Sequence, residues 1–576
     1  MIPTPKRDAS STPRAKSRHA SSLFAVLPLL DWLPRYERSW LPHDGIAGIT
    51  LAAYAIPVSL AYATLAGLPP HYGIYCYLVG GLGYAIFGTS RQLAIGPTSA
   101  IAMLVGTTVA GMADGDPARW AGIAALAALV VAVLGALAWL LRLSGLVSFI
   151  SETILTGFKA GAALTISLTQ LPKLFGVPGG GDNFFERAWI LATQLDQTNI
   201  IVLVFGLVAL SLLVLGDRLF PGRPVALFVV ALSIVAVSLA GLEQNGVSIV
   251  GEIPSGLPSF ARPSFRFRDV DGVLPLAAAC FLLGYVESVS AARTLAAKNG
   301  YEIRPRQELL ALGAANLLAA FYHGFPIAGG LSQSAVNDKS GARTPLALVF
   351  TSATIAICLL FLTGLLHNLP NVVLAAIVLV AVRGLIDVTA FRHLWRVSRF
   401  EFAISIVALA GVLLLGILKG VLLAMVISLL FLLATAASPH VAFLGRIPGT
   451  RRYSDLARHP ENEQIPGVLI FRVESSLLYF NVNQVRGRVG AKLASSESIR
   501  LMVCDLSSSP YVDVAGATML TALHSDLAKQ GIQLRVVETR ANVRDLLRAE
   551  GLEEKVGYLG RHMSVDQAIT EFGMMG

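Results

Sequence analysis

The stretch Phe325–Asp338 reads FPIAGGLSQSAVND, and a similar stretch, Gln92–Gly106, reads QLAIGPTSAIAMLVG. In each, a few residues rich in Gly and Pro precede a run of small and hydroxyl-bearing residues. Pro97 fits the first turn of a helix, where its missing N–H is not needed, and Gly329 and Gly330 allow an irregular backbone. Both stretches therefore predict an extended segment followed by the start of a helix.

These stretches lie in a chain that is too apolar for a soluble protein. Of the 576 residues, 54% are hydrophobic and 14% are charged, with a mean hydropathy of +0.65, whereas soluble proteins carry about 25% charged residues. The formal charge of +9 suits the Lys and Arg that fix the orientation of membrane proteins, and it does not indicate nucleic-acid binding. The four cysteines lack CxxC or metal-ligand spacing, so we expect no disulfide framework, metal site or cofactor.

Apolar runs between Asp44 and Ala437 predict an all-α polytopic membrane domain over residues 44–437. The expected segments are 44–68, 71–88, 92–113, 118–141, 145–172, 198–216, 224–241, 272–296, 307–323, 326–342, 345–365, 371–386, 400–418 and 420–437, fourteen in number. Several are shorter than the roughly 20 residues that a straight spanning helix needs. The short segments are expected to tilt, to span incompletely or to combine helix with extended chain.

The charge of the loops predicts the orientation of this domain. The loops expected inside are rich in Arg and Lys, and those expected outside are mostly short or acidic, with Arg262, Arg266 and Arg268 as the exception. This bias favours cytoplasmic N- and C-termini in a multi-pass protein of the bacterial-type inner membrane. Region 1–43 is expected to comprise a disordered cytosolic tail, residues 1–20, and an interfacial segment, residues 22–42.

Residues 440–576 are more polar and predict a small cytosolic α/β domain, because strands alternate with helices. The expected strands are 467–474, 499–506 and 532–538, and the expected helices are 513–531 and 541–551. About 130 residues suffice for one independent core.

The two broken segments predict an anion site. A helix that begins at membrane depth leaves its first N–H groups without partners, which is tolerated only where the break lines a cavity. These N–H groups and the positive end of the helix dipole attract anions. Thr98 and Ser99 in one segment, and Ser332 and Ser334 in the other, add hydroxyl donors. Paired breaks in two halves are typical of inverted-repeat transporters, whereas close helix packing by small residues is the alternative interpretation.

At these residues the chain resembles the SulP (sulfate permease) family of anion transporters, from about Asp44 to Phe572. The resemblance is carried by AGITLAAYAIPVSLAYATLAGLPPHYGIY (47–75), FGTSRQLAIGPTSA (87–100), TGFKAGAALTISLTQLPKLFG (156–176), QELLALGAANLLAAF (307–321), GGLSQSAVNDKSGARTPLA (329–347) and LAAIVLVAVRGLID (374–387). The resemblance implies two inverted repeats of seven segments, a core and a gate domain, a homodimer and elevator-like alternating access. It also implies that residues 440–576 are a STAS domain.

Carried onto this sequence, the family's anion site falls on matching positions of the first segment and of the two helix starts. These positions are Val58, Tyr62, Thr98, Leu331, Ser332 and Gln333, with Ser99 beside them. Val58 departs from the Gln that often follows Pro in relatives, and Gln333 stands where relatives that exchange anions often have Arg. The missing Arg weakens an expectation of chloride exchange and leaves the backbone dipoles as the main attraction.

Glu287 lies about 15 residues into its predicted segment, and a carboxylate at that depth is a functional hypothesis by default. In the SulP family, which the chain resembles, an acidic residue at this position is linked to the coupling of anion transport to protons. The alternative is a structural carboxylate bonded to Ser288 or Ser290. Replacing Glu287 with Gln is expected to abolish proton-driven accumulation and to spare counterflow.

Function is expected to be secondary active transport, with an anion channel or a non-transporting membrane protein as alternatives. The histidines show no catalytic or metal spacing and no GxxxxGK[ST] loop occurs, so we expect neither an enzyme nor a nucleotide-driven pump. Sulfate is the favoured substrate from the family resemblance, and bicarbonate, chloride and dicarboxylates stay open. In the STAS domain Ala515 replaces the phosphorylatable residue of related antagonist proteins. We therefore expect this domain to support assembly or to bind a cytosolic protein.

Overall fold

The computed structural model describes residues 27–113, 115–145, 152–181, 183–220, 223–263, 266, 269–496, 498–560 and 563–575. They separate into two compact units, one ending at Val426 and the other beginning at Ile427. The predicted disordered tail, residues 1–20, lies outside the described residues. In the described part of the predicted interfacial segment, short helical turns precede a long helix that begins at Leu41.

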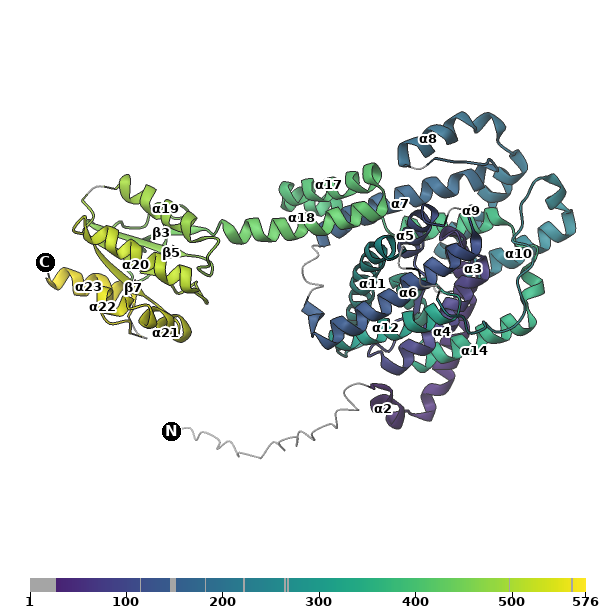
Figure 1. Cartoon of the computed structure of the whole chain (residues 1–576), viewed down its shortest axis with the longest axis horizontal. Coiled ribbons are helices and arrows are strands. Elements are labelled where there is room, and N and C mark those ends of the chain that lie inside the picture. Colours follow the sequence, from purple (N-terminus) through teal and green to yellow (C-terminus); the bar gives the residue numbers. More distant parts are fainter. Residues whose placement is uncertain are drawn as a thin grey trace, which may run out of the picture. The chain divides into compact units, whose positions relative to one another are not determined.

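The first unit is built from helices (Figure 1). Their bounds are α2 Leu29–Trp32, α3 Leu41–Leu65, α4 Pro70–Phe87, α5 Ser99–Ala110, α6 Pro117–Leu140, α7 Glu152–Phe175, α8 Phe184–Thr193, α9 Ile200–Leu219, α10 Val225–Ala240, α11 Val270–Lys298, α12 Pro305–Phe321, α13 Leu331–Lys339, α14 Leu346–Phe361, α15 Asn371–Arg383, α16 Val388–Val397, α17 Arg399–Leu415 and α18 Ile417–Ala437. Each of the fourteen predicted segments overlaps one of these helices. The sequence analysis missed α8 and α16, two amphipathic helices of 10 residues each, because it treated them as loops.

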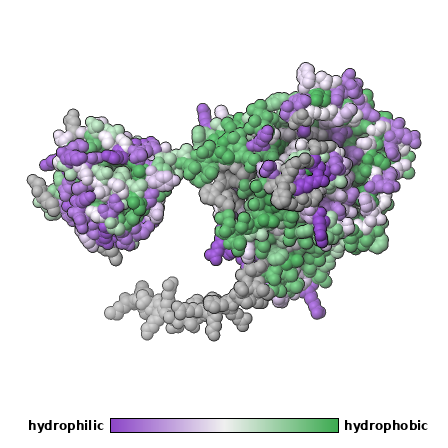
Figure 2. Space-filling model, in the orientation of Figure 1, coloured by the Kyte–Doolittle hydropathy of each residue, from purple (hydrophilic) through white to green (hydrophobic). Residues whose placement is uncertain are grey.

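The number of helices that cross the membrane stays a prediction. Among the described residues, five helical stretches are long and apolar enough to cross by themselves: Arg38–Leu65, Pro117–Leu140, Ile200–Leu219, Asp271–Lys298 and Asn371–Val397. Three further apolar helices, Ser99–Ala110, Val225–Ala240 and Leu346–Phe361, have only 10–17 residues. Large apolar side chains are exposed on several helices, among them Leu239 at 83% and Phe361 at 77%. Figure 2 shows hydrophobic colour over much of the outer surface of this unit, which suits a multi-pass membrane protein.

The helices of the first unit pack in two groups. In one group α12 packs on α4 and α6, α3 packs on α4 and α14, α11 packs on α5 and α6, and α13 packs on α3 and α11. In the other group α7 packs on α9, α15 and α17. Small residues let the backbones approach closely: a Cβ on Gly73 would lie 1.9 Å from the Ser59 carbonyl oxygen, and one on Gly157 would lie 1.8 Å from that of Ser405. We call the first set of helices, which contains α3, α11 and α12, the core group, and the second set, which contains α7, α15 and α17, the gate group.

The second unit contains a five-stranded sheet in the order β4-β3-β5-β6-β7. Its elements are β3 Val441–Arg446, β4 Tyr453–Asp455, β5 Val468–Val473, α19 Val482–Ala494, β6 Leu501–Asp505, α20 Val514–Ala528, β7 Gln533–Val537, α21 Ala541–Ala549, α22 Leu552–Val556 and α23 Val565–Met575. Strands β5, β6 and β7 run parallel, and β3 is antiparallel to β5. Helices α19 to α22 pack on one face, and α23 packs on the other.

The predicted strands and helices of this domain correspond to β5, β6, β7, α20 and α21. The sequence analysis did not predict β3, β4, α19, α22 and α23. Strands β3 and β4 are short, and only their pairing with β5 gives them a place in the sheet. Helix α19 is polar on average, so its buried stripe of Val482, Val485 and Val489 was overlooked.

Candidate anion-binding site

The two broken segments meet at a small antiparallel bridge. Strand β1, Ile95–Gly96, pairs with β2, Ala328–Gly329, and the partners are Ile95 with Gly329 and Gly96 with Ala328. Helix α5 starts directly after Thr98, and α13 starts directly after Gly330. The predicted change from extended chain to helix is therefore present in both segments, and the strands that precede the two helices pair although they lie more than 230 positions apart in the sequence.

The place of Pro97 differs from the prediction. Thr98 is the N-cap residue of α5 and has extended dihedral angles, so Pro97 precedes the cap and is not in the first helical turn. A proline restricts the residue before it to extended conformations, which here is Gly96 in β1. Pro97 therefore keeps the chain extended up to the helix start.

Gln333 joins the two broken segments through its side chain. Its amide Nε2 donates to the carbonyl oxygens of Ala94, at 3.0 Å, and Ala328, at 3.3 Å, and its Oε1 accepts from the Tyr77 hydroxyl group. The side chain is buried, with 4% of the residue exposed. All three of its hydrogen bonds end on the protein, so in this structure Gln333 is a cross-link between β1 and β2.

Ser334 also serves this junction rather than the anion site. Its hydroxyl group donates to the Gly330 carbonyl oxygen at 2.7 Å and accepts from the Ala94 amide at 2.9 Å. The expectation that Ser334 adds a free hydroxyl donor is wrong, because position 334 lies on the buried side of α13. The pattern of hydroxyl residues did not reveal which of them would face the break.

Three polar residues that the sequence analysis did not assign complete the support of β2. Asn316 on α12 donates to the Ile327 carbonyl oxygen and accepts from the Ile327 amide, both at 2.9 Å. Ser288 on α11 accepts from the Gly329 amide at 2.8 Å, and Tyr77 binds Gln333. Backbone groups at membrane depth need such partners. An Asn inside the apolar run of α12 was the available signal.

The helix starts line one cavity of 190 Å³. The seven predicted binding residues and the predicted coupling residue lie on its wall: Val58, Tyr62, Thr98, Ser99, Leu331, Ser332 and Gln333, with Glu287. The wall also includes Tyr54, Pro97, Ala100, Lys159, Ser290, Ala291, Thr294, Gly330, Ala381, Gly384 and Leu385. The core group supplies most of this wall, and α7 and α15 of the gate group supply the rest.

The wall of the cavity offers unpaired hydrogen-bond donors. The first-turn N–H groups of α5 and α13 have no intrahelical partner, and no other acceptor binds them among the described residues. The Thr98 hydroxyl oxygen is buried and likewise has no hydrogen-bond partner in the described part of the chain. Thr is a common N-cap residue, yet this hydroxyl does not cap α5. Two helix N-termini and a free hydroxyl group therefore surround a space that suits an anion.

Glu287 differs from the buried carboxylates Asp44 and Glu308 of this unit. Asp44 accepts hydrogen bonds from the amides of Arg343 and Thr344 and from the Thr344 hydroxyl. Glu308 accepts from the Tyr84 hydroxyl and from the Thr89 amide. No hydrogen bond ends on Glu287 in the described residues, and it faces the cavity.

If Glu287 were a structural carboxylate, Ser288 or Ser290 was expected to bind it, and neither does so among the described residues. The Ser288 hydroxyl donates to the Gly284 carbonyl oxygen at 2.6 Å and accepts from Gly329. Ser290 lines the cavity, and no hydrogen bond joins it to Glu287 among the described residues. The positive charge of Lys159 on α7 acts on Glu287, and Lys159 appeared in the sequence only as part of the quoted motif 156–176.

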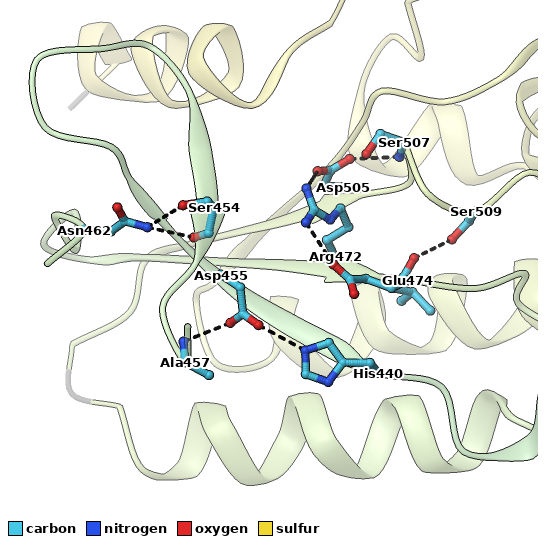
Figure 3. A network of polar contacts seen from close by, with 11 residues as sticks. His440, Ser454, Asp455, Ala457, Asn462, Arg472, Glu474, Asp505, Ser507 and Ser509 are labelled. Atoms are coloured by element: carbon cyan, nitrogen blue, oxygen red, sulfur yellow. Dashed lines mark hydrogen bonds and ion pairs between the residues drawn. The ribbon is translucent and has the colours of Figure 1, made fainter. Parts of the chain in front are cut away.

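The second unit holds its polar groups in turns and strand ends (Figure 3). Arg472 at the end of β5 binds Glu474 at 2.9 Å and lies 3.9 Å from Asp505 at the end of β6. Asp505 accepts from the Ser507 amide, and the Ser509 hydroxyl donates to the Val473 and Ser475 carbonyl oxygens. Ser507 lies in the turn after β6, and Ser509 lies in the loop that follows it.

Asp455 is the main polar anchor at the start of this unit (Figure 3). It accepts from the Ala457 amide at 2.9 Å and pairs with His440 at 3.1 Å. Burial opposes ionisation of Asp455, but the Ala457 amide, His440 and Arg458 outweigh it and hold the pKa of this carboxyl group below its ordinary value. The ionised carboxylate therefore stabilises the folded strand β4.

Family models match both units of the chain. The sulfate permease family matches residues 41–408, and the STAS domain matches residues 459–568. A probable sulfate transporter of Mycobacterium tuberculosis is 34% identical over 93% of this chain and 96% of its own length. The chloroplastic sulfate transporter 4.1 of Arabidopsis thaliana is 33% identical over 92% of this chain and 80% of its own length.

Solved transporter structures share the fold. The overall structure of SLC26A9 has a TM-score of 0.86 at 25% identity, covering 96% of this chain and 93% of that one. The murine Slc26a9 anion transporter in the inward-facing state has a TM-score of 0.88 at 24% identity, covering 98% and 97%. The transmembrane domain of a cyanobacterial bicarbonate transporter, BicA, has a TM-score of 0.59 at 22% identity, covering 69% and 98%.

These likenesses confirm the resemblance drawn from the motifs, and also the predicted fold class with its C-terminal STAS domain. The related proteins are named transporters, which confirms that the chain is not an enzyme. The chain is therefore a member of the sulfate permease family of membrane anion transporters, with a STAS domain at its C-terminus.

Proposed function

We propose that this protein is a secondary active transporter of sulfate that works by elevator-like alternating access and takes up a proton with the anion. The observation that carries the proposal is the cavity in which two helix N-termini and the unpaired Thr98 hydroxyl converge. Each helix N-terminus acts as roughly half a positive charge. Relatives named sulfate transporters support the choice of sulfate.

The two packing groups support the proposed movement. The cavity lies where the core group, which carries both helix starts, meets α7 and α15 of the gate group. A rigid shift of one group against the other would carry the anion without unfolding either helix start. Glu287 faces the same space without a hydrogen-bond partner among the described residues, so a proton on its carboxylate travels with the core group.

The remaining parts of the proposal rest on the charge pattern and the resemblance. We propose a homodimer in the bacterial inner membrane, surrounded by lipid, with both termini in the cytoplasm. The STAS domain binds a cytosolic protein or supports assembly, since Ala515 excludes phosphorylation at that position. Bicarbonate or dicarboxylate transport, and an anion channel, are the competing functions.

Purified protein in liposomes decides among these functions. Uptake of labelled sulfate, bicarbonate and fumarate is measured under an imposed pH gradient, inside alkaline, and in counterflow without a gradient. We expect saturable sulfate uptake that the gradient drives uphill. Uptake of bicarbonate or fumarate but not sulfate would overturn the substrate, and conductance without counterflow would show a channel.

The anion site is tested by Thr98→Val, which removes only the unpaired hydroxyl group. A hydrogen bond to a charged group contributes about 1.5–3 kcal/mol, so the KM for sulfate is expected to rise roughly tenfold or more without loss of stability. Thr165→Val is the matched control, because the buried Thr165 hydroxyl binds the Gly161 carbonyl oxygen of its own helix. An unchanged KM in Thr98→Val would place the anion elsewhere.

The proposed coupling of sulfate transport to protons is tested by Glu287→Gln. The control is Glu243→Gln, because Glu243 is exposed. The Glu287 variant is expected to lose uphill accumulation driven by the pH gradient and to keep sulfate counterflow. Uphill uptake at the wild-type level in this variant would exclude Glu287 as the proton carrier.

A further inference from the structure

The two formally charged side chains on the wall of the 190 Å³ cavity come from different packing groups. Lys159 belongs to α7 of the gate group, and Glu287 belongs to α11 of the core group. Both side chains are half-buried. Among the described residues no ion pair or hydrogen bond engages the Lys159 ammonium group, although its charge acts on Glu287. Lys159 is therefore available to an anion held between the helix starts.

The charges around the cavity can be summed. Two helix N-termini contribute about +1 together, Lys159 contributes +1, and an ionised Glu287 contributes −1. The other titratable residues of the wall are Tyr54 and Tyr62 of α3, phenols that carry no charge near neutral pH. Gln333 also lines the wall, but its side chain is neutral and is bonded to the protein.

We propose that Lys159 makes this transporter select divalent over monovalent oxyanions, with the gate group supplying the positive charge that the core group lacks. With Glu287 protonated, the site carries about +2 and is neutralised by a dianion. With Glu287 ionised it carries about +1 and is neutralised by a monoanion. The inference rests on the proposed function of this cavity and identifies the residue that sets the preferred valence.

This charge sum also explains why one proton would accompany one dianion. A net charge inside a low-dielectric site is costly, so the cavity that binds a dianion favours the protonated form of Glu287. While the core group still faces Lys159, the site loaded with a dianion and a proton is close to neutral. An empty site carries about +1 with Glu287 ionised and about +2 with Glu287 protonated, so the empty site favours the ionised carboxylate near Lys159.

The test compares anions that share a shape and differ in charge. Selenate is a tetrahedral dianion like sulfate, and perchlorate is a tetrahedral monoanion. Each competes with labelled sulfate in counterflow by the purified full chain in liposomes, and the ratio of the two inhibition constants measures the preference for valence. The variants are Lys159→Met, which removes the charge, and Lys159→Arg, which retains it.

Lys173→Met is the matched control. Lys173 lies in the last turn of the same helix but lines a separate cavity. The wild type, Lys159→Arg and Lys173→Met are expected to bind selenate at least tenfold more tightly than perchlorate. In Lys159→Met this ratio is expected to fall on the order of tenfold, mainly through weaker selenate binding.

The outcomes separate this inference from the proposed function. If the wild type shows no counterflow of sulfate, the transport proposal fails. If the wild type transports sulfate but perchlorate competes as well as selenate, or if Lys159→Met weakens both anions alike, transport stands and the role of Lys159 is wrong. Should Lys159→Met not fold, Glu287→Gln provides the second measurement, since it keeps Lys159 and is expected to retain the preference for selenate at all pH values.

Discussion

Replacing Gln333 with Met tests whether the two helix starts are held together by this single side chain. Met preserves the length of Gln but has no donor and only a weak acceptor. The carbonyl oxygens of Ala94 and Ala328 would each lose a donor, and the Tyr77 hydroxyl would lose its acceptor. Because these groups are buried at membrane depth, water does not replace Gln333.

The expected decrease in the free energy of unfolding follows from the number of hydrogen bonds lost. A hydrogen bond contributes about 1 kcal/mol net, and each group left unsatisfied costs about 1–3 kcal/mol. Losing three bonds in Gln333→Met therefore lowers the free energy of unfolding by roughly 3 kcal/mol or more. Tyr77→Phe removes one of them and costs about 1 kcal/mol. The double variant is expected to be no less stable than Gln333→Met, because the Tyr77 hydroxyl that lost its partner is then absent.

The assay is unfolding of the purified protein in mixed micelles with increasing sodium dodecyl sulfate, followed by near-ultraviolet circular dichroism. Sulfate KM is measured on the same preparations and is expected to rise, because the helix starts no longer hold a fixed separation. Gln170→Met is the matched control, since Gln170 is buried but its amide binds only the neighbouring Thr169 hydroxyl. If Gln333→Met unfolds like Gln170→Met and keeps the wild-type KM, the cross-link does not hold the site.

Further predictions concern helix packing and the second unit. Gly157→Ala is expected to destabilise the transport unit by more than about 2 kcal/mol in the same titration, because its Cβ would lie 1.8 Å from a backbone oxygen of α17. Gly487→Ala in α19, where a Cβ meets no atom within 4 Å, is expected to stabilise the STAS domain by about 0.5–1 kcal/mol, and destabilisation there would contradict the packing. Asp455 has a pKa lowered by the Ala457 amide and His440 against the effect of burial, so its contribution to stability is complete above about pH 3.9 and is lost as the pH falls through the folded-state pKa. Asp455→Asn is therefore expected to speed hydrogen exchange in β4 at pH 7 and to match the wild type in strong acid; an equal difference at both pH values would show that charge is not involved.

The membrane class, the place of both broken helices and the residues of the cavity could be predicted from the sequence. These features depend on local patterns: long apolar runs, Gly and Pro next to hydroxyl residues, and motifs shared with a family. Thr98, Ser332 and Glu287 were predicted on this basis, and the structure places them around one cavity. Whether they bind the anion stays a prediction.

The prediction for Ser334 failed because it needed the direction of an individual side chain. Ser334 and Ser332 are two residues apart on α13 and have the same chemistry, but one binds Ala94 and the other faces the cavity. The amide of Gln333 binds the Ala94 carbonyl oxygen, and whether Gln333 also contacts the anion stays a prediction. A short helix turns each residue by 100° relative to the one before it, so neighbours separate into buried and open positions only when the surrounding helices are in place.

The sequence by itself determined that this chain is a membrane protein with two interrupted helices and a C-terminal α/β domain, because apolar length and backbone-breaking residues act locally. Only the tertiary structure decided that residues more than 230 positions apart form a bridge, that Gln333 is a cross-link, and that Lys159 and Glu287 share a cavity from opposite groups of helices. Such pairs depend on long-range packing, in which contacts that satisfy buried polar groups select one arrangement of helices.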